Sequence, residues 1–394
     1  GLSNDREYID GLLDILSEKN IDPIIPDIIK ALSRLKAREL NSVIFVYLAH
    51  ERPDVRTAAL DALEINDDLS LKKAVLLLGD TMDSIHEFAK EKIRTAQFQN
   101  NNLLVESLGM PSTRIRRGLF ELLETLDIKE FEILMFAKKN LNKSYTCLAM
   151  EENLTLLPQG RMRDLTSEHL LQKKDVVLEN IIRVLAIHDQ TGRMKTAWRG
   201  IFSPDTRQRA NAIELLSDIL DRKTFNSMLP LLESPTPSMA LTEGRKIVKI
   251  PKMDPEGKEL LSNLLASDDW VDVLMGLNLI NEDPARYDAE KILNGLENSM
   301  HKHILKEVQM ILNKPKETST DPRRIKSTEI SLGQKILLLK EIEIFSGLSA
   351  AELAAIAAVT KELDYPEDRT ILKQKDMGET VFLIIKGRVE VIME

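Results

Sequence analysis

The chain has 394 residues, of which 43% are hydrophobic, 30% are charged and only 4% are aromatic. This composition is typical of a folded, helix-rich protein and excludes a disordered chain. The formal net charge of −9 argues against nucleic acid as a partner, because phosphate binding needs a basic surface. No apolar run approaches the ~20 residues of a membrane-spanning helix, and the single cysteine, Cys147, excludes an intrachain disulfide. We expect a cytoplasmic protein, or the cytoplasmic face of a membrane protein.

Residues 1–313 have the apolar spacing of consecutive amphipathic helices. Tyr8, Leu12 and Leu16 follow one another at i, i+4, which places them on one helical face. Prolines such as Pro53 separate the apolar segments, and proline is typical of the first turn of a helix. The first 313 residues are therefore predicted to be a succession of short helices.

An internal repeat runs through this region. Residues 111–123 and 204–216 align without a gap, and seven of the thirteen positions are identical. A third copy at 56–63 matches in residue type, and it follows the lead-in Pro-Asp-Val-Arg. The offset of 93 residues (204 − 111) is close to two units of the ~40–47 residues found in HEAT repeats. The pattern resembles HEAT repeats, which implies a mainly α-helical, armadillo-like α-solenoid with a long concave surface for protein partners.

Three arginines recur at equivalent positions of this repeat, namely Arg56, Arg116 and Arg209. We interpret them as structural residues that bond carbonyls or carboxylates of the neighbouring repeat through the planar guanidinium group. A role in catalysis is disfavoured, because catalytic residues rarely recur in repeats.

Two stretches interrupt the helical rhythm and are expected to be irregular insertions. Residues 157–174 are polar and basic, and residues 234–257 are rich in proline, serine and glycine, with a short strand expected at 246–250. Residues 314–330 read as a linker, because helical periodicity gives way to charge and proline.

Residues 331–394 have a different pattern: two short helices, then strands at 381–385 and 389–392 with glycine turns. A capping box, Ser349 with Glu352, is predicted to start the second helix. Together with the turn glycines Gly378 and Gly387, this segment resembles the N-terminal half of a cyclic-nucleotide-binding domain. The resemblance implies a small, incomplete α+β β-roll.

In that family the nucleotide phosphate binds at a helix N-terminus that carries an arginine. The resemblance places this helix beyond Glu394, in a longer protein. We therefore expect no cofactor for this chain, and cyclic nucleotide as a ligand only where the domain is completed.

A wider resemblance covers the chain from about Leu178 onwards. The order of the segments at 178–189, 202–233, 267–282 and 336–349 is similar to the cytoplasmic HEAT and cyclic-nucleotide-binding region of bacterial ATP/ADP-translocase-like proteins of the major-facilitator type. This resemblance implies a regulatory, non-transporting part of such a protein.

Signals for catalysis or metal binding are weak. Among the six histidines only His301 and His303 are close in sequence, and a spacing of i, i+2 does not place two ligands on one helical face. Walker, GxGxxG and GxSxG motifs are absent from the sequence. Asp268 and Asp269 are interpreted as a helix N-terminus, and Cys147 as a buried, inert thiol. We expect no catalytic residue and no metal site.

The leading hypothesis is a non-enzymatic scaffold or regulatory module that binds protein partners. The alternative is a cyclic-nucleotide-responsive regulator, acting on an attached ATP/ADP-type nucleotide transporter. A third reading, an enzyme or nucleic-acid binder built on a helical array, is disfavoured by the negative charge.

Overall fold

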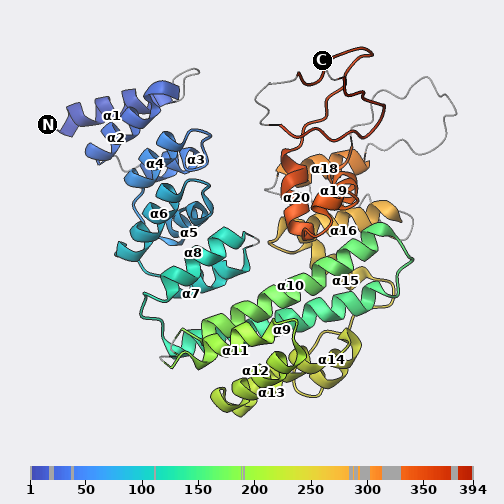
Figure 1. Ribbon diagram of the computed structural model, residues 1–394. Coiled ribbons are helices and arrows are strands. Elements are labelled where there is room, and N and C mark those ends of the chain that lie inside the picture. The colour runs from blue at the N-terminus through green and yellow to red at the C-terminus, as the bar shows by residue number, and fades with distance from the viewer. Residues whose placement is uncertain are drawn as a thin grey trace.

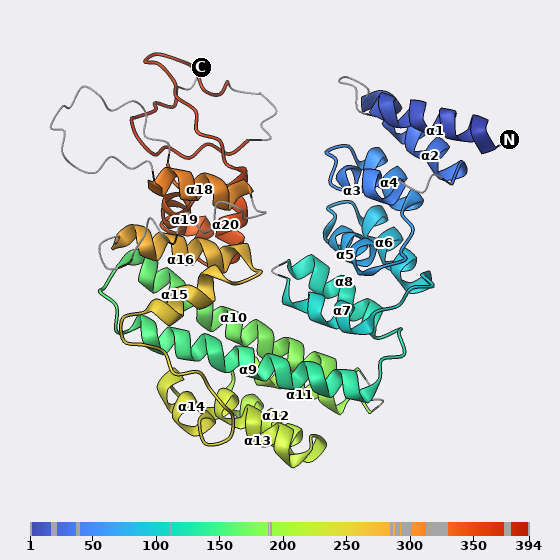
Figure 2. The ribbon, with the colours of Figure 1, turned by 180° about the vertical axis from the view of Figure 1, so that it is seen from behind.

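The computed structural model describes residues 2–16, 22–36, 40–110, 112–187, 189, 191–283, 287, 292, 302–312, 330–373 and 380–392. Over these residues the protein is helical and contains no β-strand. The mainly α class predicted from the sequence is therefore confirmed. Figure 1 shows two arms of stacked helices that rise from one side of a long helical hairpin, and Figure 2 shows the same arrangement from behind.

The first arm is a two-layered stack of short helices. Its α-helices are α1 (Leu2–Leu16), α2 (Ile25–Arg34), α3 (Leu40–Tyr47), α4 (Pro53–Ala62), α5 (Asp68–Leu76), α6 (Asp83–Thr95), α7 (Asn101–Glu106) and α8 (Thr113–Leu123). In one layer α2 packs on α4, α4 on α6 and α6 on α8. These four helices begin 28, 30 and 30 residues apart (25 to 53, 53 to 83, 83 to 113). The helix pairs thus recur about every 30 residues, a shorter period than the HEAT-like spacing predicted from the sequence.

Short polar residues and prolines begin the helices, as local sequence rules require. Pro53 is the first residue of α4. The side chains of Asn100 and Ser112 accept hydrogen bonds from backbone N–H groups at the starts of α7 and α8. Such caps satisfy donors that have no partner inside the helix. Each helix buries one apolar face in the stack. Ile29 and Leu60 are among the side chains that fill its interior.

A long hairpin joins the two arms and carries a smaller group of helices on its other side (Figure 1). The hairpin consists of α9 (Glu130–Leu154) and α10 (Arg161–Leu185), and the smaller group of α11 (Arg193–Ile201), α12 (Thr206–Ile219), α13 (Arg222–Glu233) and α14 (Pro237–Gly244). The fully buried Tyr145 of α9 donates a hydrogen bond from its hydroxyl to the carbonyl of Ser227, at 2.8 Å. This bond ties the hairpin to α13.

The second arm shares a hydrophobic core with one end of the hairpin. Its helices are α15 (Lys258–Leu265), α16 (Trp270–Glu282), α18 (Lys302–Leu312), α19 (Leu332–Lys340) and α20 (Ala350–Val359). Leu274 of α16, Ile336 of α19 and Leu353 of α20 belong to one buried cluster. The helices of the segment predicted as a separate sensor-like domain, 331–394, therefore share a core with the preceding helices. The linker predicted at 314–330 lies outside the described residues, except for its last residue.

Residues 157–174 are largely helical, which differs from the expected irregular insertion, whereas residues 234–257 contain one short helix among turns and irregular backbone. Residues 161–174 form the first half of α10, and residues 237–244 form α14. Polar content misled the prediction at 157–174, because Leu165 and Leu170 still provide a buried face and the ammonium group of Lys173 pairs with Asp269. The strand expected at 246–250 is a turn followed by irregular backbone instead.

The strands expected at 381–385 and 389–392 are not formed either. Val381 and Val391 are 79% and 85% exposed, so no neighbouring element covers them. A two-stranded hairpin without partner strands is marginally stable in water, which explains the irregular backbone. Gly387 has a φ of +101°, as expected for a turn glycine. Gly378 lies outside the described residues.

None of the described helices combines the length and the hydrophobicity that crossing a lipid bilayer requires. The two 25-residue helices of the hairpin instead bury one face against each other.

Packing between α9 and α14 gives a direct test of this arrangement. A Cβ atom at Gly244 would collide with the ring of Tyr145, whereas a Cβ atom at Gly109 would meet nothing within 4 Å. We expect Gly244→Ala to lower the free energy of unfolding by about 1–3 kcal/mol, because the ring is fully buried and cannot move aside. Gly109→Ala is the control and should be close to neutral. Urea denaturation measures both, and equal stabilities would contradict the packing.

Candidate functional site

The recurrent arginines occupy the same place in three helices. Arg56, Arg116 and Arg209 are each the fourth residue of their helix, since α4, α8 and α12 begin at residues 53, 113 and 206. Each donates a hydrogen bond from Nη1 to the backbone carbonyl six residues earlier, at 2.8, 3.0 and 2.7 Å respectively. Arg163, the third residue of α10, makes the same bond at 3.3 Å.

These bonds close the loop that leads into each helix. The acceptor carbonyls belong to the arginine's own loop, whereas the sequence suggested carbonyls or carboxylates of the neighbouring repeat. Arg56 also reaches a carboxylate of the next helix pair, through two hydrogen bonds to Asp80 of 2.6 and 2.9 Å. Burial by itself would raise the pKa of Asp80, but the hydrogen bonds from Arg56 and from the Met82 amide outweigh it and hold this pKa below its usual value.

His86 is a member of this series that sequence reasoning missed. It is the fourth residue of α6 and lies 30 residues after Arg56 and 30 before Arg116. Its ring donates from Nδ1 to the carbonyl of Leu78, at 2.6 Å, so an imidazole here closes the loop as the guanidinium groups do. The signal was the 30-residue spacing, which becomes visible only once the helix boundaries are known. We call the fourth residues of α4, α6, α8 and α12 the loop-closing positions.

Neighbouring helices of the layer formed by α2, α4, α6 and α8 are joined by polar contacts between residues 31 positions apart. The Arg114 guanidinium of α8 contacts Asp83 of α6, at 2.5 Å, and Lys90 of α6 contacts Glu121 of α8, at 2.7 Å. Lys92 of α6 donates to the backbone carbonyl of Asp61 in α4. These contacts set how each helix pair lies on the next.

A groove of ≈ 550 Å³ runs across α2, α4 and α6 of this layer. Its apolar lining includes Pro26, Ala58 and Phe88. Its charged lining residues are Asp27, Asp54, Asp61 and Lys30. Three carboxylates and one ammonium line the groove above an apolar floor, and Arg52, which pairs with Asp54, offsets part of their negative charge.

A second polar cluster is buried between α10 and α16. His169 donates from Nε2 to Asp272, at 2.7 Å, and Ser267 donates to the same carboxylate, at 2.6 Å. Lys173 contacts both Asp272 and Asp269, the latter at 3.0 Å. Burial would raise the pKa of Asp272, but the hydrogen bond from His169 and the charge of Lys173 hold it well below its usual value.

This cluster is a structural joint. Asp269 caps the N-terminus of α16, as predicted from the sequence, by accepting from the Val271 amide at 3.0 Å.

Cys147 lies in the adjacent core and is buried, and burial raises the pKa of its thiol to about 12. A thiol that stays protonated at neutral pH is a poor nucleophile. The expectation of a buried cysteine is confirmed.

The helical start of the sensor-like segment matches the sequence prediction locally. Ser349 and Glu352 form the expected capping box at the start of α20. Lys340 of α19 bonds Glu168 of α10, at 2.8 Å, and Arg161 of α10 contacts Glu341. The described part of the segment presents no ligand-binding arrangement. Pro111, His188 and His301 lie outside the described residues, as does the side chain of His303.

Comparisons with protein-family models, curated proteins and solved structures gave no match. The functional argument therefore depends on the geometry of the chain itself.

The loop-closing arginines provide a matched pair of substitutions. Arg56→Ala leaves the Asp80 carboxylate, whose side chain is 3% exposed, without its guanidinium partner, so we expect a loss of about 3–5 kcal/mol in the free energy of unfolding. Arg209→Ala removes hydrogen bonds to backbone carbonyls only, and about 1 kcal/mol should be lost. Urea denaturation at neutral pH measures the difference.

The Arg56 effect should depend on pH. Because the folded pKa of Asp80 lies below the unfolded value of about 3.9, its stabilising contribution is present above that pH and is lost as the pH falls through the folded pKa. The gap between Arg56→Ala and the unaltered chain should shrink on acidification. A gap that stays constant, or equal losses for the two arginine variants, would contradict the ion pair.

The joint between α10 and α16 can be tested in the same way. Asp272→Asn removes a buried charge from between Lys173 and His169, and we expect a loss of roughly 3 kcal/mol. Asp268→Asn alters the exposed neighbour and should change stability by no more than about 0.5 kcal/mol. Faster hydrogen exchange along α16 in Asp272→Asn alone would locate the effect.

Proposed function

We propose that this chain is a non-enzymatic helical-repeat scaffold of HEAT type that binds a protein partner. The support is the repeated architecture, in which helix pairs pack on their neighbours in the chain and the loop-closing positions recur. Such arrays expose long, continuous surfaces built from equivalent helices, and these surfaces suit extended partners.

The groove across α2, α4 and α6 is the single observation that carries the proposal. It crosses three successive helices of one layer, so an extended segment lying in it would contact equivalent positions of each helix. The acidic rim selects a positively charged segment, and the floor of Pro26, Ala58 and Phe88 accepts small apolar side chains. The proposed partner is therefore a basic, extended segment of another protein.

A regulatory role for the second arm is part of the same proposal. α19 and α20 pack on α10 and α16, and the Lys340 and Arg161 contacts join the sensor-like segment to the hairpin. A change in the C-terminal segment would thus act on the hairpin that joins the arms. This arrangement favours cyclic-nucleotide regulation as the second candidate, for a protein in which the domain is complete.

Selection of random peptides on the immobilised chain tests the groove. We expect the selected peptides to be basic and to bind the chain in solution. Charge reversal at two exposed lining residues, Asp27→Lys with Asp61→Lys, should weaken their binding by at least about tenfold, or about 1.4 kcal/mol.

A matched control separates the groove from bulk charge. Glu130→Lys with Glu214→Lys makes the same change in net charge at exposed positions of α9 and α12. The control should bind the selected peptides as the unaltered chain does. Peptides without a basic bias, or equal losses in both double variants, would refute the groove as the binding surface.

A further inference from the structure

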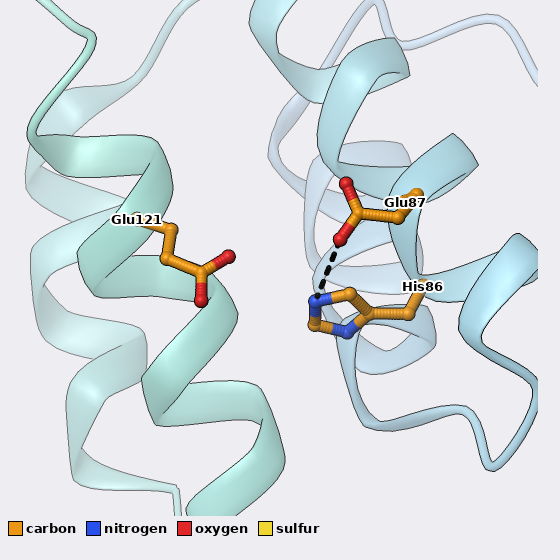
Figure 3. Close-up of side chains that lie close together, drawn as sticks. All are labelled: His86, Glu87 and Glu121. Carbon is orange, nitrogen blue, oxygen red and sulfur yellow. Dashed lines mark ion pairs between the residues drawn. The ribbon is translucent and has the colours of Figure 1, made fainter.

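Three potential metal ligands meet where α6 packs on α8, although they lie apart in the sequence. Figure 3 shows the imidazole of His86 and the carboxylate of Glu87, both from α6, facing the carboxylate of Glu121 from α8. One nitrogen or oxygen atom of each residue lies within 4.8 Å of the other two. No metal site was predicted from the sequence, because only ligands that are close along the chain can be recognised there.

The tautomer of His86 directs an acceptor at this cluster. Nδ1 must carry the proton, because its partner, the Leu78 carbonyl at 2.6 Å, can only accept. In the neutral ring Nε2 is therefore a bare lone pair. Oε1 of Glu87 lies 3.8 Å from Nε2, which is too far for a hydrogen bond, and it is itself an acceptor. A side chain only 4% exposed thus aims a lone pair at two carboxylates.

The surroundings of His86 are those of a metal-binding imidazole. A hydrogen bond from the remote ring nitrogen to a backbone carbonyl is the usual way in which a ligating histidine is oriented. Gly118 of α8 makes room for the ring, since a Cβ atom there would stand 2.8 Å from Cε1 of His86. The ring is held rigidly, whereas the two glutamates are 62% and 45% exposed and free to close on an ion.

Lys90 at present supplies one positive charge to the cluster. Its ammonium group lies 2.9 Å from the Glu87 carboxylate and 2.7 Å from that of Glu121. Arg117 of α8 adds a second positive charge, since its Nε lies 3.9 Å from the Glu121 carboxylate, so two cations already balance the two carboxylates.

We propose that His86, Glu87 and Glu121 form a binding site for a divalent transition-metal ion of the zinc class, from which Lys90 is displaced. One imidazole and two carboxylates suit Zn²⁺ better than Mg²⁺ or Ca²⁺, which prefer oxygen ligands alone. Bonds of about 2.0–2.2 Å to the three ligands require the glutamates to move inward, and water completes the coordination. The ion neutralises both carboxylates and joins α6 to α8.

Zinc titration of the full, untagged chain by calorimetry tests the proposal. The unaltered chain should bind Zn²⁺, with a rise in melting temperature because the ion links two helices. Glu121→Gln should weaken binding about tenfold or more, as loss of a ligand does at least as much damage as loss of a supporting contact. Lys90→Met should strengthen binding by about tenfold, because the competing charge is gone.

The Lys90 variant separates a metal site from an ion-pair network. In a network without metal, Lys90→Met would only destabilise the α6–α8 contact and would create no zinc affinity. Glu91→Gln alters an exposed carboxylate of the same helix that pairs with Arg94 outside the cluster, and it should bind zinc as the unaltered chain does.

Two results would overturn the proposal. The first is the absence of zinc binding by both the unaltered chain and Lys90→Met. The second is zinc binding that Glu121→Gln leaves unchanged, since the ion would then lie elsewhere. Substitution of cobalt for zinc adds a spectroscopic readout, and His86→Gln should abolish its ligand-field bands. Because His86 is buried and this variant can fail to fold, Glu121→Gln decides the outcome.

Discussion

Stacking of the helix pairs depends on the direction in which each helix of the layer that contains α4, α6 and α8 starts. A short amphipathic helix is not stable alone in water, so its apolar face must be placed correctly on the preceding pair. At the loop-closing positions an arginine or histidine side chain bonds a backbone carbonyl of the incoming loop, and this fixes the direction in which the helix starts. The polar contacts between residues 31 positions apart then set the distance between neighbouring helices. The groove and the proposed metal cluster both result from that distance.

Much of the helical architecture could be predicted from the sequence, because its signals are local. The capping box of Ser349 and the cap at Asp269 depend on residues a few positions apart, and both are present. The match between residues 111–123 and 204–216 identified Arg116 and Arg209 as equivalent, and both are the fourth residue of their helix. Local caps and repeats need no knowledge of tertiary packing.

Other features required the packing itself. At 157–174 the number of polar residues outweighed the apolar face that α10 actually buries, since a long helix at a junction tolerates many charges on its exposed sides. At 381–392 the alternation of apolar residues predicted strands, but pairing depends on neighbouring strands that the described residues do not provide. The approach of Glu121 to His86, 35 residues apart, follows from helix stacking and has no local signal.

Chemical cross-linking between neighbouring helices of one layer is the most direct test of the stacking. In a Cys147→Ser background, cysteines at Asp83 and Arg114, which the long Arg114 side chain now bridges, should be joined rapidly by a flexible thiol-specific cross-linker about as long as that side chain. Cysteines at Asp83 and Glu124 should not, because Glu124 lies ten residues further along the chain from Arg114, about 15 Å at 1.5 Å per residue. Failure of the first pair, or equal cross-linking of both, would contradict the repeated stacking on which this account depends.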